Sequence, residues 1–139
     1  MHVLGLILTL ILSLEADFTQ TKTIALMNEP QVSTGRMTYH APDYLVWEYT
    51  SPQQIVWKMD GKKSNVNPPI QRLLRMIMAS IAGGNRQDEK VMREANRFFQ
   101  SIEIIMDDQN EVAKRVELTE KNGDTTIIEF TNVITQQAL

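Results

Sequence analysis

Few side chains in this sequence have the types and spacing that catalysis needs. Two pairs of neighbouring carboxylates, Asp107-Asp108 and Asp88-Glu89, are the candidates for general acid and base chemistry. Both pairs occur in segments whose composition predicts an exposed turn or loop, so we interpret them as solvated turn residues. The two histidines, His2 and His40, are too few for a metal cluster or a Ser-His-Asp triad. We therefore expect no catalytic residues, no bound metal and no cofactor, and we expect that the protein is not an enzyme.

The composition excludes further classes of site. Cysteine is absent, which rules out disulfides, thiolate metal sites, cysteine nucleophiles and a lipid anchor on an N-terminal cysteine. The net charge is -3 and the charged residues are spread along the chain, so there is no basic stripe for nucleic acid. A chain of 139 residues with 42% hydrophobic residues is large enough for one core. We expect a single domain.

Residues 1–16 form the first distinct segment. The apolar run from Val3 to Leu12 is too short to cross a bilayer, which takes about 20 apolar residues. It has the length of a signal-peptide core, and Ala16 is a small residue at a possible cleavage point. The alternative is a first helix, apolar all round, that packs inside the domain. We predict that 1–16 is a signal peptide or a first apolar helix, and that 17–139 is the domain.

The rest of the chain is predicted to be mainly β, with one helix. Two-residue alternation and turn-forming residues predict strands at 16–24, 36–40, 44–49, 55–59, 62–66, 98–106, 112–120 and 125–133, with 27–35 as a connection. The segment 85–97 is polar, and its composition is compatible with either a short exposed helix or a loop.

A helix is predicted over 69–82, because apolar residues recur there at the helical period. Its stripe consists of Ile70, Leu73, Leu74, Ile77, Met78 and Ile81. Taken alone, such a stripe is typical of core packing. Here one helix must serve roughly seven strands that carry large side chains, an arrangement that favours a concave apolar space between helix and sheet. The methionines would suit ligands of variable shape.

Several short motifs occur together in an order and spacing that resemble the outer-membrane lipoprotein carrier (LolA) family. In the first half they are Ala16-Asp17-Phe18-Thr19-Gln20, Ser33 and Gly35, Pro42-Asp43-Tyr44-Leu45-Val46-Trp47, Ser51-Pro52 and Asp60-Gly61. The later stretch from Ile102 to Asn132, with Gly123-Asp124-Thr125, is similar to the family's C-terminal hairpins. The resemblance covers most of the chain except its middle.

This resemblance implies an α+β fold: a curved antiparallel sheet that forms an incomplete half-barrel, covered by an amphipathic helix over an apolar cavity. It implies a periplasmic carrier, in a Gram-negative-type bacterium, that binds the acyl chains of lipoproteins or lipids. Its partners would be an inner-membrane lipoprotein-releasing transporter and an outer-membrane acceptor. Mapped onto this sequence, the cavity and lid residues would be Phe18, Met37, Leu45, Trp47, Ile55, Trp57, Leu73, Leu74, Ile77, Met78 and Ile81.

Two departures from the family pattern qualify the resemblance. Many members have an arginine, tied to lid closure, directly before the proline that is Pro42 here, and this chain has Ala41. The chain is also short between Gly61 and Phe98, which predicts a smaller or more open cavity.

The alternative function is an envelope sensor domain of the same fold that binds lipid or protein without transporting it. The membrane-anchored acceptor of the pathway is disfavoured because it needs a lipidated cysteine, and we expect a monomer.

Overall fold

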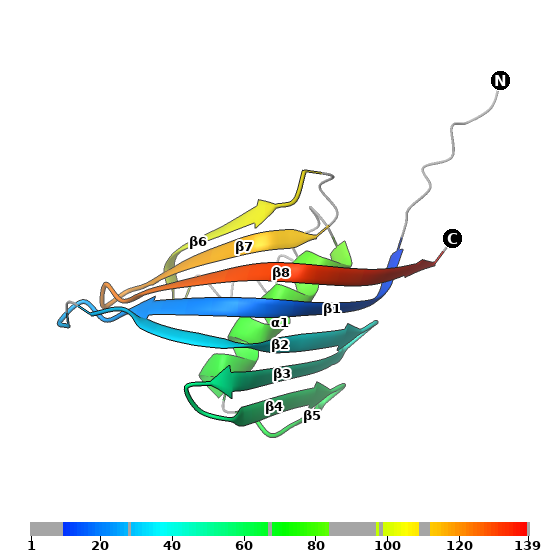
Figure 1. Ribbon diagram of the computed structural model, residues 1–139, viewed down its shortest axis with the longest axis horizontal. Coiled ribbons are helices and arrows are strands. Elements are labelled where there is room, and N and C mark those ends of the chain that lie inside the picture. The colour runs from blue at the N-terminus through cyan, green and yellow to red at the C-terminus, as the bar shows by residue number, and fades with distance from the viewer. Residues whose placement is uncertain are drawn as a thin grey trace.

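The computed structural model describes residues 10–27, 29–66, 68–83, 97, 99–108 and 112–138. These residues form one open antiparallel sheet of eight strands in the order β5-β4-β3-β2-β1-β8-β7-β6, with the helix α1 (Pro68–Gly83) against one face (Figure 1). The strands are β1 (Leu10–Thr23), β2 (Gln31–His40), β3 (Tyr44–Ser51), β4 (Ile55–Asp60), β5 (Lys63–Ser64), β6 (Phe99–Met106), β7 (Ala113–Glu120) and β8 (Thr125–Ala138).

Strand β1 is the centre of the sheet and pairs with β2 on one side and β8 on the other. Its threonine-rich alternation suits a pleated strand that has one face buried and one face wet. The register between β1 and β8 shifts between Glu15 and Asp17, and β8 accommodates an extra residue there. Asn132 sits at this bulge with a φ of 52°, a conformation that asparagine tolerates better than most residues.

The core lies between α1 and the sheet face that the helix covers. Leu74, Ile77 and Met78 of α1 are buried, as the predicted apolar stripe requires, and Met76, which was not part of that stripe, is buried as well. On the sheet side the buried residues alternate along β1, β2, β3, β7 and β8, with Phe18 and Trp47 among the largest. Their rings stack with centroids 4.0 Å apart. Offset aromatic stacking of this kind adds about 0.5–1.5 kcal/mol to the burial of the rings.

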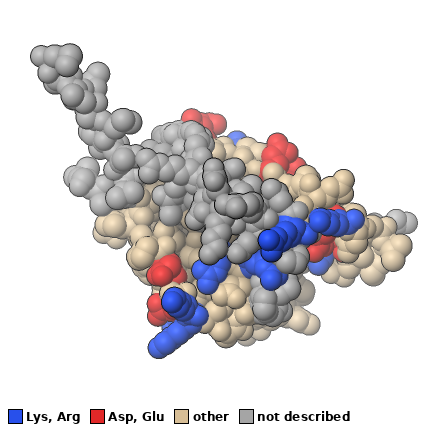
Figure 2. Space-filling model, turned by 180° about the vertical axis from the view of Figure 1, so that it is seen from behind, with Lys and Arg blue, Asp and Glu red and all other residues tan. Residues whose placement is uncertain are grey.

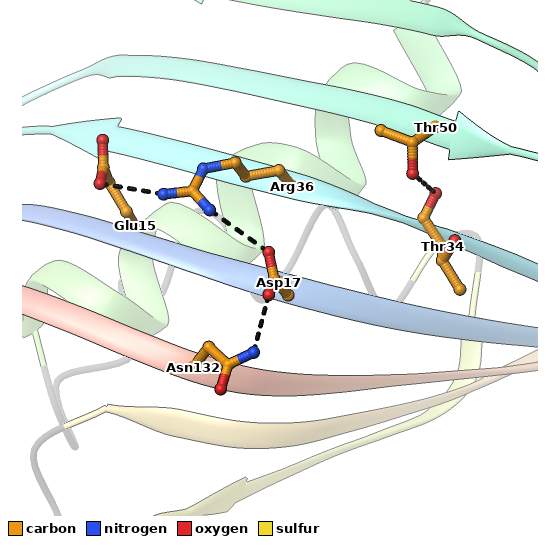
Figure 3. Close-up of polar contacts among 6 residues, drawn as sticks. All are labelled: Glu15, Asp17, Thr34, Arg36, Thr50 and Asn132. Atoms are coloured by element: carbon orange, nitrogen blue, oxygen red, sulfur yellow. Dashed lines mark hydrogen bonds and ion pairs between the residues drawn. The ribbon is translucent and has the colours of Figure 1, made fainter.

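The opposite face of the sheet carries a network of polar contacts (Figure 3). Arg36 on β2 reaches across to two carboxylates of β1, with 3.1 Å from Nη2 to Glu15 Oε2 and 3.4 Å from Nη1 to Asp17 Oδ1. Asn132 donates from Nδ2 to Asp17 Oδ2 at 2.8 Å. These groups are exposed, so each ion pair contributes about 1 kcal/mol or less. The arrangement marks this face as the solvated one.

The structure corrects the predicted start of two strands. Strand β1 begins at Leu10. The prediction of a first apolar helix over 1–16 is therefore wrong for residues 10–16, which form part of the central strand. Residues 1–9 lie outside the described residues. Strand β2 begins at Gln31, although Ser33 and Gly35 were predicted to belong to a connection. Gly35 lies inside this strand, and glycine is needed there because the Phe18 ring and the Glu48 main-chain oxygen leave no space for a Cβ atom.

The other elements agree with the sequence pattern to within a few residues, and β8 extends beyond the predicted end. The helix predicted over 69–82 runs from Pro68 to Gly83. The mainly β, antiparallel character of the prediction is confirmed. Within the described part of the chain, no helix has both the length and the apolar composition that a membrane crossing requires.

Candidate functional site

Two adjoining pockets open on the helix side of the sheet. The inner pocket, about 290 Å³, lies between α1 and the sheet and is lined by Gln20, Lys22, Tyr49, Trp57, Arg72, Leu73, Phe99, Leu118, Glu120 and Thr126. The outer pocket, about 620 Å³, lies at the β2–β3–β4 end and is lined by Gln20, Gln31, Val32, Ser33, Tyr49, Ser51, Pro52, Gln53, Ile55 and Trp57. The inner volume is at the lower end of the range for small-molecule sites, about 300–1,000 Å³.

Gln20, Tyr49 and Trp57 line both pockets and so form the wall between them. The Tyr49 hydroxyl donates to Gln20 Oε1 at 2.7 Å, and the Tyr49 ring meets Trp57 edge to face at 5.1 Å. Burial raises the pKa of Tyr49, while contacts of its hydroxyl with Trp47 and Gln20 oppose part of that rise. The hydroxyl therefore stays protonated at neutral pH and holds Gln20 in place.

A buried aromatic cluster packs against Tyr49 of this wall. Trp47 stacks on Phe18, and its ring is edge-on to Phe130 at 6.2 Å and to Tyr49 at 6.4 Å. The indole N–H of Trp47 is buried next to the Tyr49 hydroxyl, but it meets hydrogen-bond geometry with none of the described acceptors. A buried donor of this kind costs stability, so the cluster depends on ring packing for its stability.

The inner pocket is lined by both apolar and charged side chains. Trp57, Leu73, Phe99 and Leu118 supply apolar walls from β4, α1, β6 and β7. The charged members of the lining are Lys22 from β1, Arg72 from α1 and Glu120 from β7. This combination suits a molecule with an apolar body and a polar end.

The outer pocket has a different chemistry. Its polar lining consists of neutral amides and hydroxyls, and no charged side chain is among the residues that line it. Val32 and Ile55 contribute apolar surface there, and both are exposed, at 53% and 38%. The outer pocket is thus a shallow mixed surface that continues from the inner pocket past Tyr49 and Trp57.

The residues predicted to bind a ligand all lie on the helix side of the sheet or on α1, but the structure separates them into two groups. Ile55, Trp57 and Leu73 line a pocket. The other seven described residues are buried in the closed core: Phe18, Met37, Leu45, Trp47, Leu74, Ile77 and Met78. The Ile81 side chain lies outside the described residues. Their role in binding remains a prediction.

Of the candidate carboxylates and histidines, the structure describes Asp107, Asp108 and His40. Asp107 closes the β6–β7 turn: its N–H donates to the Val112 carbonyl at 2.9 Å, and its Oδ1 accepts from the Val112 N–H at 3.4 Å. Asp108 and His40 are exposed, while Asp88-Glu89 and His2 lie outside the described residues. No group of three or more possible metal ligands occurs among the residues that are described.

The sequence prediction missed the polar members of the inner pocket. Gln20 and Lys22 follow Phe18 at two-residue spacing and so share its face of β1. Their position could have been inferred from that alternation alone. Phe99, Leu118 and Glu120 were not found because their approach to α1 depends on the order of strands in the sheet, with β6 and β7 beyond β8.

Comparison with known proteins agrees with the resemblance noted from the sequence. Residues 10–76 match the family model for the outer membrane lipoprotein carrier protein LolA. No curated protein matches the chain significantly. Among solved structures, the crystal structure of a DUF1329 family protein from Desulfovibrio piger is similar, with 8% identity, a TM-score of 0.35, and coverage of 91% of this chain and 86% of that chain.

Proposed function

Because residues 10–76 match the family model for the outer membrane lipoprotein carrier protein, we propose that this chain is a carrier that binds the acyl chains of lipoproteins and moves them toward the outer membrane. Proteins of this family are periplasmic, and we propose the same location for this one. An inner-membrane lipoprotein-releasing transporter would supply the cargo, and an outer-membrane acceptor would receive it. No catalytic step is part of the proposal.

The observation that carries the proposal is the inner pocket between α1 and the sheet. Trp57, Leu73, Phe99 and Leu118 offer an acyl chain apolar contacts from four elements. Burial of a methylene is favourable by about 0.8 kcal/mol, so even part of a chain is held appreciably. In this proposal α1 acts as the lid, and a shift of α1 would enlarge the pocket for longer chains.

The second candidate is a sensor that binds envelope lipid or protein without carrying it. The open outer pocket favours this candidate, because its neutral amides and hydroxyls offer hydrogen bonds to a polar ligand or a peptide main chain. Both candidates use the same face of the sheet. They differ in whether cargo leaves the membrane.

An extraction assay separates the two candidates. Membrane vesicles that contain a triacylated lipoprotein are mixed with the purified full-length protein, and the lipoprotein in the supernatant is measured after sedimentation. A carrier releases lipoprotein in proportion to the added protein. If the protein binds a fluorescent acyl chain but leaves all lipoprotein in the pellet, the sensor is correct and the carrier is not.

A further inference from the structure

The charged side chains at the inner pocket are concentrated at one end of the sheet. Lys22 on β1 pairs with Thr126 on β8, and Thr126 pairs with Leu118 on β7. Lys22 and Thr126 are thus close to the ends of their strands, next to the β1–β2 and β7–β8 turns. These two turns are joined there by a hydrogen bond of 3.0 Å from the Ala25 N–H to Asp124 Oδ1.

The helix brings a second cation to the same pocket. Arg72 lies directly before Leu73 in α1, and both line the inner pocket together with Lys22. Figure 2 shows lysine and arginine side chains gathered on the helix side of the molecule, with acidic side chains among them. Among the described residues of the pocket lining, Lys22 and Arg72 are cationic and Glu120 is anionic.

Apolar and charged side chains therefore line the same pocket. Leu73, Phe99 and Leu118 offer contacts to a hydrocarbon tail, and Lys22 and Arg72 belong to the same lining. Lys22, Arg72 and Glu120 are all half-buried, so their charges are screened less than those of fully exposed groups. An anionic head placed among them gains attraction from two cations and repulsion from one carboxylate.

We infer that the inner pocket prefers a single-chain amphiphile with an anionic head, a carboxylate or a phosphate, over an uncharged amphiphile with the same tail. The inference rests on the proposed acyl-binding function and names the ligand class of that site. A volume of about 290 Å³ is small for several chains and is compatible with one short chain. Lys22 and Arg72 would be the residues that determine head-group specificity.

The test compares three ligands that have the same tail. Decanoate, decyl phosphate and decanol, each below its micelle concentration, displace a neutral fluorescent acyl probe from the full-length protein at low salt. We expect both anions to bind about fivefold more tightly than decanol, the factor that one favourable, partly exposed ion pair provides. The preference should shrink in high salt.

Variants with opposite expected effects make the test specific. Lys22→Gln and Arg72→Gln should each weaken anion binding severalfold and leave decanol unchanged, whereas Glu120→Gln should strengthen anion binding. Lys58→Gln is the matched control, because Lys58 is on the far face of β4, with Nζ 5.5 Å from the centre of the Tyr44 ring. Circular dichroism confirms that each variant is folded.

The outcomes distinguish this inference from the proposed function. A preference for decanoate alone, decyl phosphate alone or both supports the inference and identifies the head group. Equal displacement by all three ligands overturns the inference and leaves acyl binding intact. Failure of the wild-type protein to bind even the neutral probe overturns the acyl-binding function, and the inference with it.

Discussion

Removal of residues 1–16 should abolish folding or nearly so, because residues 10–16 are the first half of the central strand. Leu14 pairs with Tyr39 on β2 and with Thr135 on β8, so the truncation breaks two strand pairings at once. A chain that begins at Asp17 also loses the buried side chains of Ile11, Leu14 and Ala16.

The magnitude follows from burial. Ile11 and Leu14 are 6% and 2% exposed, and full burial of such a side chain contributes about 1.5–3 kcal/mol. Together they account for about 3–6 kcal/mol, before the lost main-chain hydrogen bonds are considered. Natural domains are stable by only about 5–15 kcal/mol, so the truncation removes a large share of the total.

Urea unfolding, followed by far-ultraviolet circular dichroism, measures the effect. The matched control removes only residues 1–9, which leaves every described pairing of β1 in place, and we expect its unfolding midpoint to equal that of the full chain. The chain from Asp17 should show no cooperative transition or a much lower midpoint. Equal midpoints for all three proteins would refute the assignment of residues 10–16 to the sheet.

Two further predictions concern the sheet that carries the pockets. Gly35→Ala should destabilise the fold by about 3 kcal/mol or more, because the new Cβ would overlap the Glu48 main-chain oxygen and lie 2.6 Å from Phe18 Cζ; a loss below about 1 kcal/mol in urea unfolding would contradict this. The contribution of Tyr39 and Tyr49 to stability should be constant up to about pH 10 and fall above it. Burial raises the pKa of Tyr39 and of Tyr49 above 10.0, with Asp43 adding to the rise at Tyr39, so the unfolded chain ionises first. Tyr49→Phe should reduce the loss of stability above about pH 10. An identical pH profile of stability for the variant and the wild type would contradict the raised pKa of Tyr49.

The sequence was sufficient to predict the hairpins, the helix, and which face of the strands and of the helix points into the core. Strict alternation places Leu45 and Trp47 on one side of β3, and the helical period places Leu74 and Ile77 on one side of α1. The start of β1 could not be predicted, because an apolar run such as the one ending at Leu12 is equally typical of a signal-peptide core. Local pattern cannot separate these possibilities, since only pairing with β2 and β8 makes the run a strand.

The site was only partly predictable for a related reason. Periodicity identifies apolar residues that face inward, but it does not tell which of them are closed in the core, as Leu74 is, and which border a space, as Leu73 does. The charged residues of the inner pocket come from β1, α1 and β7, which are far apart in the sequence. Their meeting depends on the strand order and the position of α1, and neither follows from local spacing.

The central claim is that an acyl chain occupies the inner pocket, and uptake of a fluorescent acyl chain by the Leu73→Glu variant tests it most directly. Leu73 is half-buried in the pocket wall, so the substitution places a charge beside the ligand without removing a fully buried core side chain. Leu73→Met is the control that keeps the wall apolar. We predict saturable uptake by the wild type and by Leu73→Met, and loss of uptake in Leu73→Glu with an unchanged circular dichroism spectrum. Undiminished uptake by folded Leu73→Glu, or none by the wild type, would contradict the claim.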